Sequence, residues 1–201
     1  MSDLILLGDE AVARAAIDAG ITAAYAYPGT PSTEIYQAIE DHAKKHGLPI
    51  KGFWSTNEKV ALEEGVGVSY AGCRALVAMK HVGLNVAADP FMNVAVSGAH
   101  GGLVIVVADD PSMHSSQNEQ DSRYFADFAM VPCLEPASQQ QCYDMTREAF
   151  ELSEQLKVPV LLRLVTRLAH SRSQVRLAPP RAQNKPHYVD DPARFTLIPA
   201  N

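Results

Sequence analysis

The sequence predicts an α/β domain: a doubly wound, mostly parallel sheet with helices on both faces. Segments with the 3.6-residue period of a helix alternate with short β-rich runs, a pattern typical of βαβ units. The run Leu-Val-Ile-Val-Val at residues 103–107 is apolar throughout, as expected for a central strand that is covered on both faces. The 201 residues are enough for one such domain with its own core.

The expected elements follow one another in regular order. The predicted helices span residues 10–19, 32–46, 58–71, 83–97, 122–130 and 138–156. The predicted strands span residues 21–27, 51–55, 75–79, 103–107, 133–135 and 158–164. Gly20, Gly47 and Gly72 end three of the helices. Pro90 is compatible with the helix at 83–97 only near its start or at a break, because it lacks a backbone donor.

The last 31 residues differ in character from the rest. Prolines punctuate a polar stretch of weak periodicity, at Pro179, Pro180, Pro186, Pro192 and Pro199. We therefore expect a folded domain at residues 1–170 and a Pro-rich tail or linker at residues 171–201.

Charge and cysteine usage limit the classes of function. The formal net charge is −6, and no cluster of Lys and Arg indicates a nucleic-acid surface. The start of the chain lacks the basic residues of a signal peptide, and no run of about 18 apolar residues predicts a membrane span. Cys73, Cys133 and Cys142 are too few for a four-cysteine iron–sulfur cluster, and their odd number suits a reducing compartment. We expect a cytoplasmic protein.

Polar stretches follow several predicted strands, at the edge where open α/β sheets bind ligands. The first reads YPGTPSTE at residues 27–34. The hydroxyls of Thr30, Ser32 and Thr33, with the amides of the following helix, are suited to a carboxylate or another anion. A helix cap after a tight turn is the alternative.

The second stretch places a glutamate at the start of a helix. Glu58, Ala61, Leu62 and Gly65 share one face by their spacing, and that face is small and apolar apart from the glutamate. This pattern predicts that Glu58 turns inward. The alternative is an exposed acid that favours the positive end of the helix.

Two further stretches contain candidate binding groups. Lys80 and His81 follow the strand at 75–79, and a polar segment at 109–123 follows the central strand. A structural or surface role is the alternative for both. The sequence contains no HExxH or HxxEH pattern of a zinc enzyme and no GxSxG elbow of a hydrolase.

Taken together, these stretches resemble the N-terminal domain of the alpha subunit of the indolepyruvate:ferredoxin oxidoreductase family. The matching segments are GDEA at 8–11, YPGTPSTE at 27–34, NEKVA at 57–61, MKHVGLN at 79–85 and QNEQDSR at 117–123. Their order and spacing carry the resemblance, which covers residues 4–170. It implies a pyrimidine-type domain that binds thiamine diphosphate together with a partner domain, which holds the diphosphate through Mg²⁺.

The resemblance also implies roles for individual residues. Glu58 matches the catalytic glutamate that shares a proton with the aminopyrimidine ring. Cofactor contacts are implied for Glu58 and for Pro28, Gly29, Val82, Gly83 and Asn85. Substrate contacts are implied for Thr30, Lys80 and His81. Arg123 is a candidate for binding the substrate carboxylate, without positional support.

The implied activity is the oxidative decarboxylation of a 2-oxoacid to an acyl-coenzyme A, with electrons passed to iron–sulfur clusters and ferredoxin. The chain lacks the Gly-Asp-Gly segment of a diphosphate site and the cysteines of the clusters. The diphosphate-binding and iron–sulfur/ferredoxin parts must therefore lie on partner chains or missing domains. The chain is then either a separate subunit or a piece of a longer protein, and an oligomer is expected.

Two other functions remain open at this point. One is the pyrimidine-type subunit of a non-oxidative decarboxylase of the sulfopyruvate or phosphonopyruvate type. The other is a non-catalytic assembly subunit with the same fold. The sequence also leaves open which 2-oxoacid is used, which electron acceptor serves it and the stoichiometry of the assembly.

Overall fold

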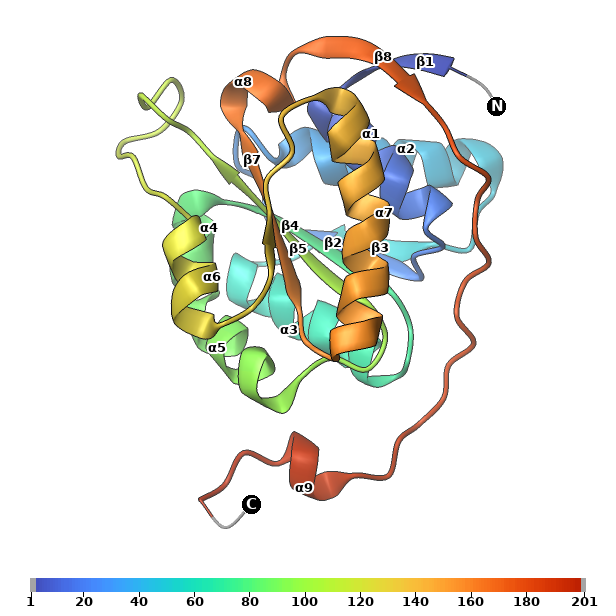
Figure 1. Ribbon diagram of the computed structural model, residues 1–201, viewed down its shortest axis with the longest axis vertical. Helices are drawn as coiled ribbons and strands as arrows, with labels where there is room; N and C mark the ends of the chain where they lie inside the picture. The colour runs from blue at the N-terminus through green and yellow to red at the C-terminus, as the bar shows by residue number, and fades with distance from the viewer. Residues whose placement is uncertain (1–2, 200–201) are drawn as a thin grey trace.

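The computed structural model describes residues 3–199 and is built around a six-stranded sheet in which all paired strands are parallel (Figure 1). The strands lie in the order β3-β2-β4-β5-β7-β6. Their bounds are β2 Ala23–Ala26, β3 Lys51–Trp54, β4 Ala75–Lys80, β5 Leu103–Asp109, β6 Cys133–Leu134 and β7 Val160–Val165. The predicted α/β fold is confirmed, with the run at 103–107 inside a fully buried inner strand and β6 at an edge.

The helices cover both faces of this sheet. One face carries α1 Gly8–Asp18, α2 Thr33–His46 and α7 Gln139–Leu156. The other carries α3 Glu58–Tyr70, α4 His81–Val86, α5 Ala88–Ser97 and α6 Arg123–Ala129. None of the helices within residues 3–199 combines the length and the apolar character that crossing a membrane requires.

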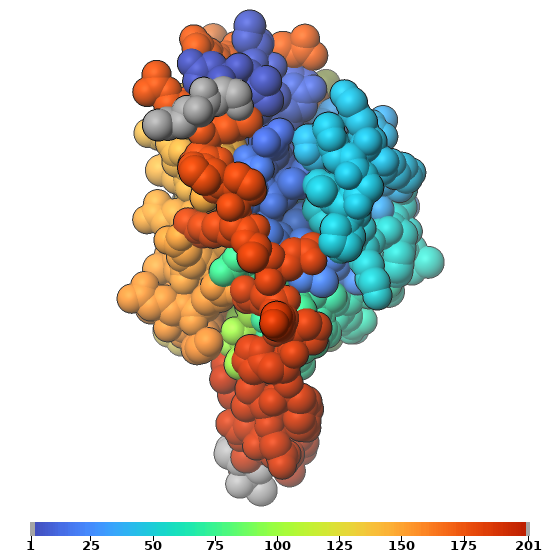
Figure 2. All heavy atoms as spheres, turned by 90° about the vertical axis from the view of Figure 1, so that its right-hand side faces the viewer, coloured from blue at the N-terminus to red at the C-terminus, as the bar shows by residue number. Residues whose placement is uncertain are grey.

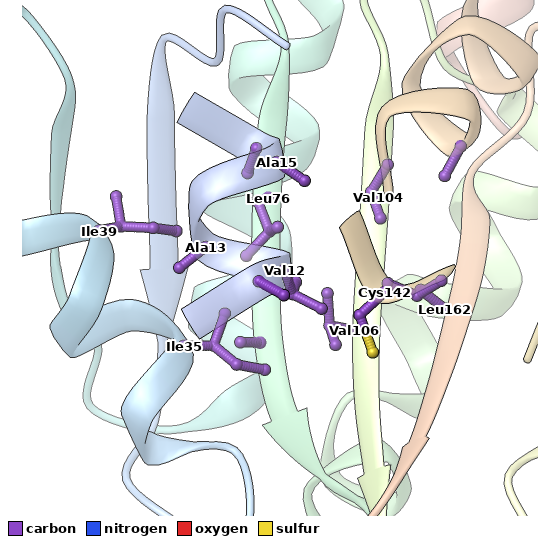
Figure 3. Close-up of a cluster of buried hydrophobic side chains, with 14 of the residues drawn as sticks. Val12, Ala13, Ala15, Ile35, Ile39, Leu76, Val104, Val106, Cys142 and Leu162 are labelled. Carbon is purple, nitrogen blue, oxygen red and sulfur yellow. The ribbon is translucent and has the colours of Figure 1, made fainter. Parts of the chain in front are cut away.

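Alternating side chains of the strands divide the core into two layers. Leu76, Val104 and Val106 point to the layer beneath α1 and α7, whereas Val77 and Ile105 point to the layer beneath α3. Figure 3 shows the first layer, in which the small side chains of α1 allow that helix to lie close to the sheet. Both layers are filled, so ligand sites are expected at the strand ends rather than within the core.

Some local structure differs from the sequence prediction. The expected helix at 83–97 is two helices, which meet at Ala87, and Pro90 lies in the first turn of the second helix, as its missing donor requires. Asp3–Leu7 forms β1, which pairs antiparallel with β8, Arg172–Arg176, in a small second sheet. The short helix α8, Thr166–Ala169, precedes β8, and α9, Pro192–Phe195, lies near the C-terminus.

The C-terminal segment packs along the domain. The expected irregular tail begins with β8 and then runs in extended form over the face seen in Figure 2, between α7 and α2. The Arg181 amide donates to the Asp18 carbonyl at 2.7 Å, and the His187 amide donates to Ala71 at 2.9 Å. The ring of His187 also meets His100, with 2.7 Å between their Nε2 atoms. A domain boundary at residue 170 stays a prediction, but the residues after it are held by contacts with the domain.

Candidate functional site

The order of the strands brings three of the predicted stretches to one place. The chain leaves β2 for β3 on one side, whereas it leaves β4 for β5 on the other. The carboxyl ends of β2 and β4 therefore form a topological switch point, the usual position of a ligand crevice in such sheets. The loop at 27–32 follows β2, α4 follows β4, and α3 follows the neighbouring β3.

Glu58 lies at this edge, in the first turn of α3. Asn57 caps the helix by accepting a hydrogen bond from the Val60 amide at 3.0 Å. The glutamate is only 8% exposed, and Ala61, Leu62 and Gly65 are buried on the same face. The predicted inward orientation of Glu58 is therefore confirmed.

The Glu58 side chain lies directly against the backbone of Gly83 in α4. A Cβ atom placed on Gly83 would stand 2.4 Å from Glu58 Oε1 and 2.8 Å from Cδ, so only glycine leaves room for the carboxyl. Among residues 3–199, no group donates a hydrogen bond to this carboxyl. The Glu58 oxygens keep some contact with solvent, so the carboxyl is open to a ligand at this edge.

The other acidic residues of α3 face away from this position. Glu63 is exposed, as expected. Glu64, which the helical spacing predicts to be solvated on another face, is instead half-buried and accepts a hydrogen bond from the Ser55 hydroxyl at 2.6 Å. Glu58 is thus the acid of this helix that faces α4.

The loop after β2 is closed by its own hydroxyl groups. The Ser32 hydroxyl donates to the Gly29 carbonyl at 2.7 Å, and the Thr33 hydroxyl accepts from the Gly29 amide at 2.9 Å. These two side chains therefore fix the loop, whereas Thr30 is exposed and lacks such a contact to the loop backbone. A Cβ atom on Gly29 would lie 3.2 Å from the Lys80 Cβ, so the loop lies against the end of β4.

Lys80 and His81 connect β4 to the segment that follows β5. The Lys80 ammonium donates to the Ser115 carbonyl at 2.8 Å, and His81 Nε2 lies 3.2 Å from the Asn118 carbonyl. Since a carbonyl only accepts, that contact assigns the proton to Nε2 and leaves Nδ1 as an acceptor. His81 is 1% exposed, and Nδ1 has no partner among the described residues.

The segment after β5 is anchored by a buried aspartate. The Asp110 carboxylate accepts hydrogen bonds from the hydroxyls of Ser116 and Thr166, both at 2.6 Å, and from the Ser115 amide at 2.7 Å. Burial acts to raise the pKa of Asp110, but these hydrogen bonds outweigh it and hold the pKa well below its usual range. The polar segment at 109–123, for which a surface role was the alternative, is therefore fixed at its base.

A buried ion pair supports the same segment and was not predicted. Arg163 in β7 is 6% exposed, and its Nε donates to Asp109 at 2.6 Å. Asp109 also accepts from the Ser122 amide at 3.0 Å, so this pair fixes both ends of the segment. An arginine inside the apolar run of β7 is the sequence signal that could have identified it, because such a charge needs a buried partner.

Arg123, the candidate for binding a substrate carboxylate, forms ion pairs on the surface. Its guanidinium donates to Asp121 at 2.6 Å and contacts Glu135 at 3.4 Å. The hydrogen bonds from Arg123 lower the pKa of Asp121 to about 2. Since both of its partners are acidic, the arginine is held away from an incoming carboxylate.

The structure thus gathers most of the predicted site residues at one edge. Glu58 lies against Gly83, and Gly29 lies against Lys80. Lys80 and His81 both contact the segment after β5. Val82 is half-buried in α4, whereas Pro28, Thr30 and Asn85 are exposed near that edge. The roles of these three exposed residues stay predictions.

The chain is similar in sequence to several known proteins. The chain is 48% identical to the indolepyruvate oxidoreductase subunit IorA of Methanothermobacter marburgensis and to that of Thermococcus kodakarensis, over 98% of its own length. It covers 32% and 31% of these two relatives, so it spans about a third of their length. The 2-oxoglutarate synthase subunit KorA of Methanothermobacter thermautotrophicus is 29% identical over 87% of the chain and is 48% covered.

A solved structure supports the fold. The 2-oxoglutarate:ferredoxin oxidoreductase of Magnetococcus marinus superposes with a TM-score of 0.75 at 21% identity, over 98% of this chain and 33% of that one. Residues 14–196 match the family model described as pyruvate flavodoxin/ferredoxin oxidoreductase, thiamine diphosphate-binding. The chain therefore belongs to the pyruvate flavodoxin/ferredoxin oxidoreductase family, of which it contains the thiamine-diphosphate-binding region.

Proposed function

We propose that this chain supplies the aminopyrimidine-binding half of a thiamine-diphosphate site in a 2-oxoacid:ferredoxin oxidoreductase of the indolepyruvate type. The observation that carries the proposal is the Glu58 carboxyl, buried at the start of α3 against the bare backbone of Gly83. The family match and the indolepyruvate oxidoreductase relatives support the same function.

The residues at this edge fit such a ring. A carboxyl can both donate and accept a proton, which an aminopyrimidine nitrogen requires of its partner. In the proposal Glu58 holds and exchanges that proton, while Gly29, Val82 and Gly83 line the ring, with Pro28 and Asn85 at its margin. Glycine at 83 lets the ring edge and the carboxyl approach the α4 backbone closely. Thiamine diphosphate, when bound, supplies the electron sink for decarboxylation of a 2-oxoacid.

The substrate is proposed to enter beside the loop after β2. Thr30 is exposed there, and Lys80 and His81 lie next to that loop at the end of β4. The Lys80 ammonium is a cation that favours a carboxylate nearby, and the buried Nδ1 of His81 has no partner within residues 3–199. The proposed reaction is oxidative decarboxylation to an acyl-coenzyme A, with ferredoxin as the electron acceptor.

Partner parts are needed to complete this reaction. In the proposal a diphosphate-binding domain or subunit holds Mg²⁺, and iron–sulfur clusters lie on partner chains or on parts of the protein outside this sequence. Exposed apolar side chains support a covering partner: Tyr124 and Phe128 on α6 are 74% and 77% exposed, and Met130 just after it is 89% exposed. The relatives that are 48% identical are named indolepyruvate oxidoreductase subunits, which favours this function over a non-oxidative decarboxylase.

The variant Glu58→Gln tests the proposal, since it keeps the shape of the side chain but cannot exchange a proton. We expect turnover of the assembled enzyme to fall by about 10²- to 10⁴-fold, the usual contribution of general acid–base catalysis. The assay is reduction of ferredoxin by indolepyruvate and coenzyme A, with 2-oxoglutarate as the competing substrate. Glu63→Gln, an exposed change on the same helix, should keep full activity.

Thermal unfolding and the co-purifying chains complete the experiment. Glu58→Gln should unfold at the wild-type temperature, because the carboxyl makes no hydrogen bond within the described part of the chain. A purified Glu58→Gln enzyme with full turnover would remove the assignment. Mass spectrometry of the co-purifying chains should identify a subunit with iron–sulfur cysteines if the oxidative reaction is correct.

A further inference from the structure

A second group of titratable side chains lies on the opposite face of the sheet, away from α3 and α4. Asp9 in the first turn of α1, Glu34 in the first turn of α2 and His170 just after α8 bring one ligand atom each within 4.8 Å of one another. These residues are far apart in sequence, and the packing of three helices brings them together.

Close packing of α8 on α1 places the histidine. A Cβ atom on Gly8 would stand 2.4 Å from the Leu168 carbonyl oxygen and 3.1 Å from the Ala169 Cα. Only glycine therefore allows the backbone of α8 to lie on the start of α1. This contact sets His170 beside Asp9, and its Nε2 lies 3.6 Å from Glu34 Oε2.

Asp9 is the unusual member of the group. It is 0% exposed, and neither of its carboxylate oxygens has a partner among the described residues. Glu34 Oε2 is also buried and has no hydrogen bond. The adjacent Glu10 differs, because its carboxylate accepts from the Leu7 amide at 2.8 Å.

An ordinary helix-end role does not account for this arrangement. The positive end of α1 favours a carboxylate, but a carboxylate that is fully buried also needs donors. A cation between the three groups would supply the missing partner for both carboxylates at once.

We propose that Asp9, Glu34 and His170 form a binding site for one divalent transition-metal cation, Zn²⁺ or Mn²⁺. An imidazole nitrogen with two carboxylate oxygens suits these cations, whereas Ca²⁺ and Mg²⁺ take shells of oxygen ligands. Two ligands about 2.1 Å from a tetrahedral cation are about 3.4 Å apart, close to the 3.6 Å between His170 and Glu34.

The exposure of the three residues fits an accessible site with a fixed base. Asp9 is buried at the bottom, whereas the side chains of Glu34 and His170 are 40% and 36% exposed and can close on the ion. Glu34 directly follows Thr33, whose hydroxyl holds the loop that carries Thr30. The cation would thus tie this loop to α1 and α8, although it lies outside the proposed cofactor site.

Metal binding can be measured without turnover, so the result is independent of the proposed function. Purified protein is freed of metal with a chelator and titrated calorimetrically with ZnCl₂ and, separately, with MnCl₂. The variants are Asp9→Asn and His170→Ala, and Glu40→Gln on α2 is the matched control because its carboxylate pairs with Lys44 on the surface. His187→Ala is measured in parallel, to test whether the observed Zn²⁺ binding comes from the His100–His187 pair instead.

We expect the wild-type protein to bind about one equivalent of cation. Asp9→Asn and His170→Ala should bind it at least about tenfold more weakly, whereas Glu40→Gln and His187→Ala should bind it with wild-type affinity. Asp9→Asn keeps the size and shape of the side chain, so it should stay folded, which circular dichroism verifies. Failure of the wild-type protein to bind either cation would overturn the proposal. Equal binding by Asp9→Asn, or loss only in His187→Ala, would overturn it as well.

Discussion

Gly83→Ala should displace the Glu58 carboxyl while it leaves the stability of the fold nearly unchanged. The added Cβ would lie 2.4 Å from Glu58 Oε1, whereas ordinary contact begins at 3.4 Å, so the carboxyl has to move by about 1 Å. A misplacement of about 1 Å in a catalytic group costs about 10²-fold in rate. We therefore expect turnover of the assembled enzyme to fall by about two orders of magnitude.

The same change should leave the free energy of unfolding nearly unaltered. Gly83 lies within α4 and does not have a positive φ, so alanine fits its backbone and gains about 1 kcal/mol of helix propensity. Moving the flexible end of Glu58 off its rotamer costs about 0.5–1.5 kcal/mol, which offsets that gain. Ferredoxin reduction and urea unfolding, measured on the same preparation, test the two expectations separately.

Gly67→Ala is the matched control for this experiment. Gly67 lies in the same helix as Glu58, it is exposed, and nothing lies within 4 Å of the atom that the substitution adds. The control should keep wild-type turnover and gain slightly in stability. A Gly83→Ala enzyme with wild-type turnover and an intact fold would refute the proposed contact between the carboxyl and the reacting ring.

Two further substitutions test the structure around the site. Gly65→Ala should lower the free energy of unfolding by about 1–3 kcal/mol, because the new Cβ would stand 2.4 Å from Val77 Cγ2 in the core. A decrease of less than about 0.5 kcal/mol, measured by urea unfolding, would contradict this packing. Asp110→Asn should cost about 2 kcal/mol at pH 7, since it weakens charge-assisted hydrogen bonds. The folded-state pKa of Asp110 is depressed, so the extra stability of the wild type is present above the unfolded pKa of about 4 and shrinks as pH falls below it. A difference in free energy of unfolding between wild type and Asp110→Asn that stays constant from about pH 7 to about pH 3 would contradict the assignment.

Local patterns explain what the sequence predicted well. The inward orientation of Glu58 follows from the spacing of Ala61, Leu62 and Gly65, because a helix can bury only one such stripe. The inner position of β5 follows from its unbroken apolar run. The site edge was predictable for a related reason: in a parallel sheet the segments that follow the strands all emerge on the same side.

Long-range contacts explain what the sequence left out. Nothing near Glu58 in the chain shows that Gly83 will lie against its carboxyl, and the pairing of β1 with β8 joins residues from opposite ends of the domain. The group of Asp9, Glu34 and His170 was missed because its members come from three helices and match no short metal-binding motif. Such groups depend on the tertiary packing, which local patterns do not specify.

The path of the chain also bears on how the site is completed. Phe195 packs against Tyr70, with 4.4 Å between the ring centres, and Tyr70 is the last residue of the helix that Glu58 begins. At 1.5 Å per residue, the two ends of α3 are about 18 Å apart. A segment that leads from Phe195 to Glu58 therefore has to span about the length of this helix. The exposed aromatic side chains of α6 offer a surface for such a segment or for another chain, and cross-links from α6 identify the part that lies on it.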